Sequence, residues 1–219
     1  MARTLSLKLD PISSTLNYEE LSKKLDALPG VSKVETNPSS NALTLHTSEN
    51  FDTPSAICKI AESTDVALKL EGGKLYGVGD MGCGGCSGMV KGEFEKVSKD
   101  VVVDLDTKIA VMGKVEKDEK SVDDVVEIVR KKGKRVMEWN SANGVYLDVV
   151  RNGGEKGMDE EGLKKIAEEV KNVEKCRLIQ GNEGAKTVLK CEGILDLNAL
   201  KEVMAKNNVQ IGLHSAVSA

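Results

Sequence analysis

Two cysteines lie three residues apart in a glycine-rich stretch, Met81-Gly82-Cys83-Gly84-Gly85-Cys86-Ser87-Gly88. This spacing brings both sulfurs within reach of one ion, and glycine lets the backbone wrap around it without side-chain clashes. Cys86 is expected at the start of a helix, where free N–H groups and the helix dipole favour the thiolate. Two thiolates with no histidine or carboxylate favour Cu(I) over Ca²⁺, Mg²⁺ or a closed four-ligand zinc site. The sequence therefore predicts a soft-metal site at Cys83 and Cys86.

A Cys-x-x-Cys pair also occurs in thioredoxin-like oxidoreductases, where it cycles between dithiol and disulfide. Those pairs normally have an aromatic residue or a proline close by and belong to a parallel sheet, and neither feature is found in this pattern. A purely structural interpretation, with two cysteines as small apolar fillers, fits poorly with an exposed glycine-rich loop. Metal binding is therefore the favoured interpretation.

The other cysteines and both histidines are interpreted as structural residues. Five cysteines are an odd set, which argues for a metal or redox site rather than a disulfide framework. Cys58 falls on an apolar helix face, and Cys176 and Cys191 fall on two strands where we expect them to face each other on the core side. Buried free thiols are favoured there over a second metal site. His46 and His214 are expected to be ordinary strand residues.

The elements that position the cysteine loop recur three times, with a period of roughly 70 residues. Each repeat shows the alternation of strands and the i, i+4, i+7 apolar spacing of helices, in the order β-α-β-β-α-β. This order predicts an α+β fold of three tandem ferredoxin-like βαββαβ sandwiches, each with two helices on one face of a four-stranded antiparallel sheet. We expect the first unit over residues 1–71, the middle unit over 72–141 and the third unit over 142–219.

Only the middle unit carries the cysteine loop, which lies between a strand expected over 74–78 and a helix expected over 87–97. Its second helix is expected to begin at Ser121, a plausible N-cap, and to end at Lys132, with Gly133 as the C-terminal cap.

The loops at the equivalent position of the outer units have no cysteine pair. Alignment of the apolar helix positions places Ser14 and Asn17 where the middle unit has its two cysteines, and the third-unit loop 151–158 contains no cysteine. We therefore expect one metal site in three units.

The middle unit resembles a heavy-metal-associated (HMA) domain of the eukaryotic copper metallochaperone type. The similarity runs from Leu75 to Trp139 and includes Met-x-Cys-x-x-Cys, Val-Val-Val-Asp-Leu-Asp-Thr-Lys and Val-Arg-Lys-Lys-Gly-Lys-Arg-Val. It implies that Met81 packs inward beneath the loop and that Lys134 lies near the sulfurs, where its ammonium would stabilise the net negative charge of a dithiolate Cu(I) complex. The outer units resemble the family by pattern alone and are interpreted as degenerate copies.

Three positions around the motif have more than one interpretation on sequence alone. Lys134 is equally consistent with a solvated cluster that includes Lys131, Lys132 and Arg135. Gly82 occupies a position where threonine or histidine is common in copper carriers and aspartate in zinc-exporting relatives, so zinc or cadmium remains an alternative to Cu(I). Asp80 is interpreted as an ordinary loop acid.

Composition and charge argue against several classes of function. The chain has 219 residues, 40% hydrophobic and 30% charged, which is typical of a folded soluble protein. No apolar run approaches the ~20 residues of a membrane span and no signal peptide opens the chain, so a cytoplasmic protein without membrane insertion is expected. A net charge of −4 without a long basic block makes nucleic acid an unexpected partner.

The leading hypothesis is a cytosolic, non-enzymatic metallochaperone. It would pass one ion by thiolate exchange to a metal-accepting domain, such as that of a copper-transporting ATPase. The alternative is an interaction or scaffold protein whose single metal site is regulatory.

Charge suggests a role for the first unit. It has seven basic and ten acidic side chains, whereas the middle unit balances thirteen against thirteen. Complementary charge orients encounters between surfaces. We therefore expect the first unit either to dock against the basic edge of the middle unit and shield the site, or to mimic an acidic acceptor.

Overall fold

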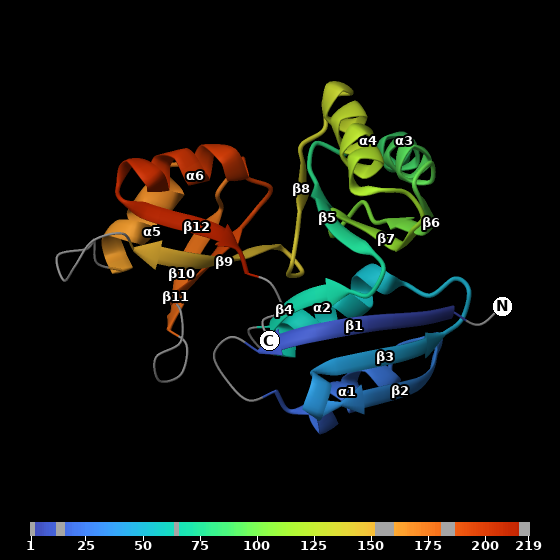
Figure 1. Cartoon of the computed structure of the whole chain (residues 1–219). Helices are drawn as coiled ribbons and strands as arrows, with labels where there is room; N and C mark the ends of the chain where they lie inside the picture. The colour runs from blue at the N-terminus through green and yellow to red at the C-terminus, as the bar shows by residue number, and fades with distance from the viewer. Residues whose placement is uncertain (1–2, 12–15, 64–65, 152–159, 181–186, 215–219) are drawn as a thin grey trace.

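The computed structural model describes residues 3–11, 16–63, 66–151, 160–180 and 187–214. These residues form a mixed α/β structure with three four-stranded antiparallel sheets, and two helices accompany each sheet (Figure 1). The three sheets share one topology, with strand orders β2-β3-β1-β4, β6-β7-β5-β8 and β10-β11-β9-β12. This architecture is consistent with three ferredoxin-like units.

The elements follow one another in the same order in each unit, apart from a short 3-10 turn. The first unit contains β1 (Arg3–Pro11), α1 (Tyr18–Asp26), β2 (Val31–Asn37), η1 (Pro38–Ser40), β3 (Ala42–Thr47), α2 (Thr53–Ser63) and β4 (Val66–Leu70). The middle unit contains β5 (Lys74–Val78), α3 (Gly84–Phe94), β6 (Ser98–Val103), β7 (Ile109–Val115), α4 (Glu119–Lys131) and β8 (Val136–Glu138). The third unit contains β9 (Gly144–Arg151), α5 (Glu160–Glu168), β10 (Lys175–Gln180), β11 (Thr187–Glu192), α6 (Leu197–Lys206) and β12 (Val209–Leu213).

Helix α3 begins three residues earlier than the apolar spacing predicted and ends at Phe94. Cys83 takes an extended conformation at the N-cap, so the helix begins at Gly84 and Cys86 lies within its first turn. The apolar stripe did not reveal this start because the first two helical residues are glycines without side chains.

Helix α4 also begins earlier than expected. Its N-cap is Asp118, whose carboxylate accepts a hydrogen bond from the backbone N–H of Ser121 at 2.8 Å. Ser121 was therefore the wrong choice, because aspartate caps as well as serine does and an earlier cap lengthens the helix. Gly133 follows the helix with φ +80°, and this confirms its role as the C-terminal cap.

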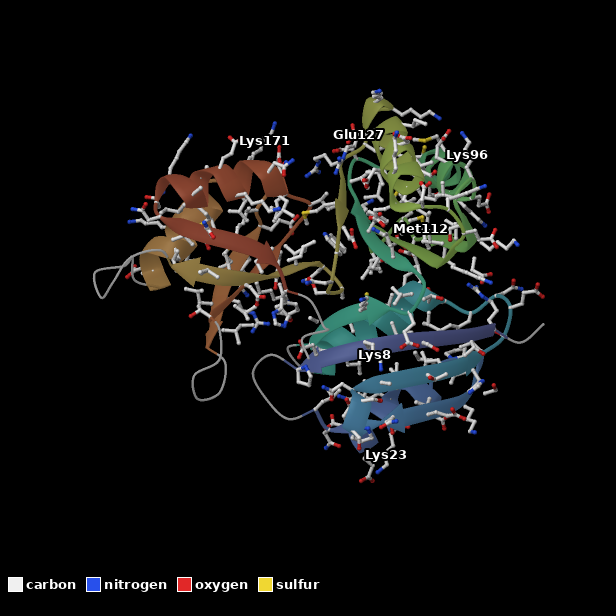
Figure 2. The ribbon with its side chains drawn as sticks, viewed as in Figure 1. Lys8, Lys23, Lys96, Met112, Glu127 and Lys171 are labelled. Carbon is white, nitrogen blue, oxygen red and sulfur yellow. The ribbon has the colours of Figure 1, made fainter. Side chains whose placement is uncertain are left out.

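The middle sheet is buried on both faces. Tyr76, Val78 and Met112 pack beneath α3 and α4, and Figure 2 shows Met112 inside this unit. Leu75 and Val111 lie in the larger apolar cluster, which also contains residues of the first and third units. Because alternate residues of a strand point to opposite faces, the second face of this sheet forms the core between units. The three units are thus packed against one another through a shared apolar core.

The first unit contacts the middle unit on this second face. Helix α2 packs against β6 and β7, β4 lies beside β5, and Arg3 pairs with Asp100 at 3.6 Å. Cys83, on the opposite side of the sheet, remains exposed. The expectation that the first unit docks on the basic edge and shields the site is therefore wrong, because an apolar sheet face provides the larger driving force for burial.

Asn140 and His214 join all three units at one point. The backbone carbonyl of Asn140 accepts from the N–H of Leu68 in the first unit at 2.8 Å, and its side-chain amide donates to the carbonyls of Tyr146 and His214. His214 follows β12 and places Nδ1 2.6 Å from Asp148 and Nε2 3.0 Å from Asp10. His214 is thus not an ordinary strand residue, since it bridges the third unit to the first.

Within the described residues, no helix is both long enough and apolar enough to cross a membrane.

Candidate metal centre

The cysteine loop is the candidate metal loop. This metal loop connects β5 to α3 at one end of the middle sheet, beside the loop that joins α4 to β8. Cys83 is exposed at the N-cap, and Cys86 is half-buried in the first helical turn. The backbone carbonyl of Cys83 accepts from the N–H groups of Cys86 at 2.9 Å and of Ser87 at 3.3 Å, which closes the turn. The two sulfurs lie 3.7 Å apart. Since a metal–sulfur bond to zinc is about 2.3 Å long, sulfurs at this separation can both bind one ion.

The environment of Cys86 favours its ionised form. The backbone N–H of Gly82, with further contributions from Cys83 and Lys134, lowers the pKa of the Cys86 thiol to about 7. Hydrogen bonds to a sulfur stabilise its negative charge relative to the neutral thiol. A considerable fraction of Cys86 is therefore thiolate at neutral pH, and the thiolate is the form that binds metals.

Lys134 lies at the site. Its ammonium is 3.4 Å from the sulfur of Cys86 and donates a hydrogen bond of 2.6 Å to the backbone carbonyl of Asp80. Its neighbours in sequence are engaged elsewhere: Lys132 pairs with Glu93 at 2.6 Å, and Arg135 pairs with Asp80. The basic run is therefore divided among different contacts, with Lys134 directed to the sulfur of Cys86 and the carbonyl of Asp80.

The other supporting residue, Met81, is buried at 3% exposure in the core of the middle unit, below the loop. Sequence reasoning missed a second lysine here: Lys108, in the turn between β6 and β7, donates from Nζ to the backbone carbonyl of Met81 at 2.8 Å. The Asp-Leu-Asp-Thr-Lys turn indicated a hairpin but not the end of the sheet at which it would meet the metal loop.

Sequence reasoning also missed the contact between Asp80 and Arg135. The guanidinium places Nε 2.8 Å and Nη2 3.3 Å from the two carboxylate oxygens of Asp80, and this contact lowers the pKa of Asp80 below its usual range. Asp80 is therefore more than a loop acid. No sequence pattern relates these residues, which lie 55 positions apart.

The described part of the chain contains no group of three or more His, Cys, Asp or Glu side chains that could hold a metal ion. Within the described residues, Cys83 and Cys86 are thus a pair of sulfurs without a third side chain of this kind beside them. A closed structural zinc site has four ligands, so this arrangement fits a soft ion of low coordination number better.

The remaining cysteines lie apart from this loop. Cys176 and Cys191 face each other across β10 and β11, with Leu178 opposite Leu189, and this confirms the predicted register. Both thiols are buried, at 1% and 0% exposure, with the sulfurs 2.9 Å apart. A hydrogen bond between the two thiols, together with burial, raises the pKa of Cys191 far above its ordinary value. This environment disfavours the thiolate that a metal requires, and the pair therefore belongs to the core.

The outer units differ from the middle unit at the equivalent loop. Asn17 is the N-cap of α1, and its side chain accepts from the N–H of Glu20 at 3.1 Å. A capping amide thus occupies this place in the first unit. Ser14 and most of the third-unit loop 151–158 lie outside the described residues.

Neither the protein-family models nor the curated proteins give a match to this chain. Among solved structures, the water-soluble region of the P-type ATPase CopA from Bacillus subtilis matches at 17% identity, covering 63% of this chain and 91% of that chain, with a TM-score of 0.29. The N-terminal soluble domains of Bacillus subtilis CopA match at 14% identity, covering 64% and 95%, with a TM-score of 0.31. Similarity at this level carries no argument about function, which rests on the loop residues themselves.

Proposed function

We propose that this protein is a cytosolic, non-enzymatic carrier of one soft metal ion, with Cu(I) favoured, held by Cys83 and Cys86. The observation that supports it best is the pair of sulfurs 3.7 Å apart at a helix N-terminus, with a lysine ammonium 3.4 Å from one of them. Thiolates are the ligands that soft ions prefer, and two thiolates on Cu(I) leave one negative charge for the lysine to stabilise.

The same geometry supports transfer by thiolate exchange. Cys83 is exposed and Cys86 is half-buried beside Lys134, so a thiolate from an acceptor domain can approach the ion from the side of Cys83. Cys83 would then be the first sulfur released, while Cys86 keeps the ion until a second acceptor sulfur replaces it. The acceptor is expected to offer a pair of exposed thiols, as the metal-binding domain of a copper-transporting ATPase would.

Anaerobic titration tests this proposal. We expect native mass spectrometry to find one tightly held Cu(I) per chain, and none in a Cys83→Ser, Cys86→Ser double variant. Parallel titrations with Zn²⁺ and Cd²⁺ against a competing chelator would rank the three ions. Two or three tightly held Cu(I) ions, or retention by the double variant, would contradict a single site at these cysteines.

A scaffold function is the second candidate, because the first unit replaces the thiol pair with a capping asparagine. In that case a partner would bind the protein without receiving the ion, and Cu(I) bound at Cys83 and Cys86 would change the affinity for that partner. A thiol oxidoreductase is distinguished by catalytic reduction of insulin, which a carrier does not perform.

A further inference from the structure

We propose that Arg135 is a positioning residue for the metal centre and acts through Asp80 on Lys134. This inference rests on the proposed function, since it assigns a role in metal retention. Arg135 forms no hydrogen bond to either cysteine among the described residues, yet its guanidinium joins the segment that leads into the metal loop to the third unit.

Arg135 contacts Gly79, the residue that follows β5. The backbone N–H of Gly79 donates to the carbonyl of Arg135 at 2.9 Å, and the guanidinium lies close to Gly79. A Cβ at position 79 would lie 3.0 Å from Nη2 and 3.1 Å from Cζ of Arg135. A side chain at position 79 would therefore press on the guanidinium, which would have to shift by a few tenths of an ångström.

Asp80 has an unusual backbone conformation. Its backbone has φ +60°, in the left-handed region that few residues other than glycine, asparagine and aspartate adopt. The two-point contact with Arg135 holds this carboxylate in place, because a planar guanidinium fixes direction as well as distance. The contact between the Asp80 side chain and Arg135 therefore sets the orientation of the Asp80 backbone carbonyl.

Lys134 connects Asp80 to the sulfur of Cys86. The backbone carbonyl of Asp80 accepts from Nζ of Lys134 at 2.6 Å, and the same ammonium lies 3.4 Å from the sulfur of Cys86. A lysine side chain has four rotatable bonds and a flexible stem, so a second partner restricts where its charge lies. Arg135 thus fixes the position of the Asp80 carbonyl, and this carbonyl holds the Lys134 ammonium beside the sulfur of Cys86.

The third unit supplies a further anchor. Nη1 of Arg135 donates to the backbone carbonyl of Ile194 at 3.2 Å, just after β11. Ile194 is itself buried in the apolar cluster shared by the three units. The third unit therefore has a physical connection to the metal loop although it contributes no sulfur to it.

A double-mutant cycle tests the pathway on the full chain. Arg135→Gln should weaken Cu(I) retention about threefold to tenfold in competition with a chromogenic Cu(I) chelator, because Lys134 loses its fixed position. Asp80→Asn, which tolerates the left-handed backbone, should have a similar effect, and Arg135→Lys should be intermediate. In a Lys134→Met background, Arg135→Gln should cause no further loss. An equal fold-loss in both backgrounds, or no loss in the single variant, would overturn the proposal.

Arg130→Gln is the matched control. Arg130, in the last turn of α4, donates to a backbone carbonyl as Arg135 does, that of Val136, but pairs with Glu127 instead of contacting the metal loop. It should leave Cu(I) retention unchanged.

A readout without metal separates this inference from the proposed function. In ¹⁵N NMR spectra of the metal-free protein, Arg135→Gln should shift the amide signals of Gly82 and Cys83, and Arg130→Gln should not. If wild-type protein retains no Cu(I), the carrier function fails while these shifts still test the positioning. If wild-type protein retains Cu(I) and the shifts are absent, the positioning role fails alone.

Discussion

At the scale of single residues, the five cysteines differ in environment rather than in chemistry. The Gly82 N–H, Cys83 and Lys134 lower the pKa of Cys86 to about 7, whereas the contact with Cys176 and burial raise that of Cys191. Reactivity follows the thiolate fraction and exposure, so one chain contains both reactive and inert thiols.

Alkylation with iodoacetamide should reveal this difference. Cys86 should be modified with a pH midpoint near 7, because the fraction of thiolate rises through its pKa. Cys176 and Cys191 should react only after unfolding. The measurement is peptide mass spectrometry across pH 5 to 9; rapid labelling of Cys191 in the folded protein would contradict the description of its environment.

Lys134 provides a second prediction at this scale. Lys134→Glu should raise the pKa of Cys86 and weaken Cu(I) retention, since a carboxylate would replace the ammonium 3.4 Å from the sulfur. Lys131→Glu makes the same charge change on an exposed residue one turn earlier and should do much less. Equal effects of the two substitutions would indicate a general charge effect of the basic run.

At the scale of elements, the middle sheet depends on a close contact between β5 and the residue after β8. A Cβ at Gly77 would lie 2.1 Å from Cε2 of the Trp139 ring, which packs in the core between units. Glycine is needed at this position because the indole occupies the space of a side chain.

Gly77→Ala should therefore destabilise the protein by about 1–3 kcal/mol, the usual range for overpacking a core. Gly92→Ala is the matched control, because Gly92 is exposed in α3 and a Cβ there meets nothing within 4 Å. That control should stabilise the helix by up to about 1 kcal/mol. Denaturant unfolding checks both values, and an unchanged midpoint for Gly77→Ala would show that the ring moves aside freely.

At the scale of the whole molecule, His214 connects the first and third units through the carboxylates of Asp10 and Asp148. Both ring nitrogens can donate only when the imidazole is protonated. The hydrogen bond to Asp10, with support from Asp148, raises the pKa of His214 above its ordinary value. The asparagine amide of Asn140 fixes the backbone carbonyl of the same histidine.

The stabilisation from His214 should depend on pH. A raised pKa in the folded state means that the contribution is full below about pH 6.5 and is lost as pH rises through the folded pKa. Between pH 6 and 9, wild-type protein should lose more free energy of unfolding than a His214→Gln variant, as measured by denaturant unfolding at each pH. His46→Gln serves as the control for the other histidine. Identical pH profiles for wild type and His214→Gln would show that this bridge does not hold the units together.

Periodicity alone indicated much of the element order. Alternating Leu7 and Leu9 in β1, and the stripe of Leu21 and Leu25 in α1, are buried as their spacing required. The pairing of Cys176 with Cys191 followed from strand alternation and hairpin symmetry. The Cys-x-x-Cys motif predicted that two sulfurs lie close together, because a tight turn keeps side chains three positions apart near each other whatever surrounds them.

Contacts between distant segments could be decided only by the tertiary structure. Arg135 meets Asp80 and Ile194, and His214 meets Asp10, across 55, 59 and 204 positions of sequence. The face that the first unit covers was also mispredicted from net charge, because the valine-rich middle strands bury both faces of their sheet. Local spacing fixes which residues point the same way along one element, whereas the choice of neighbour depends on how complete elements pack and which surfaces remove most apolar area from water.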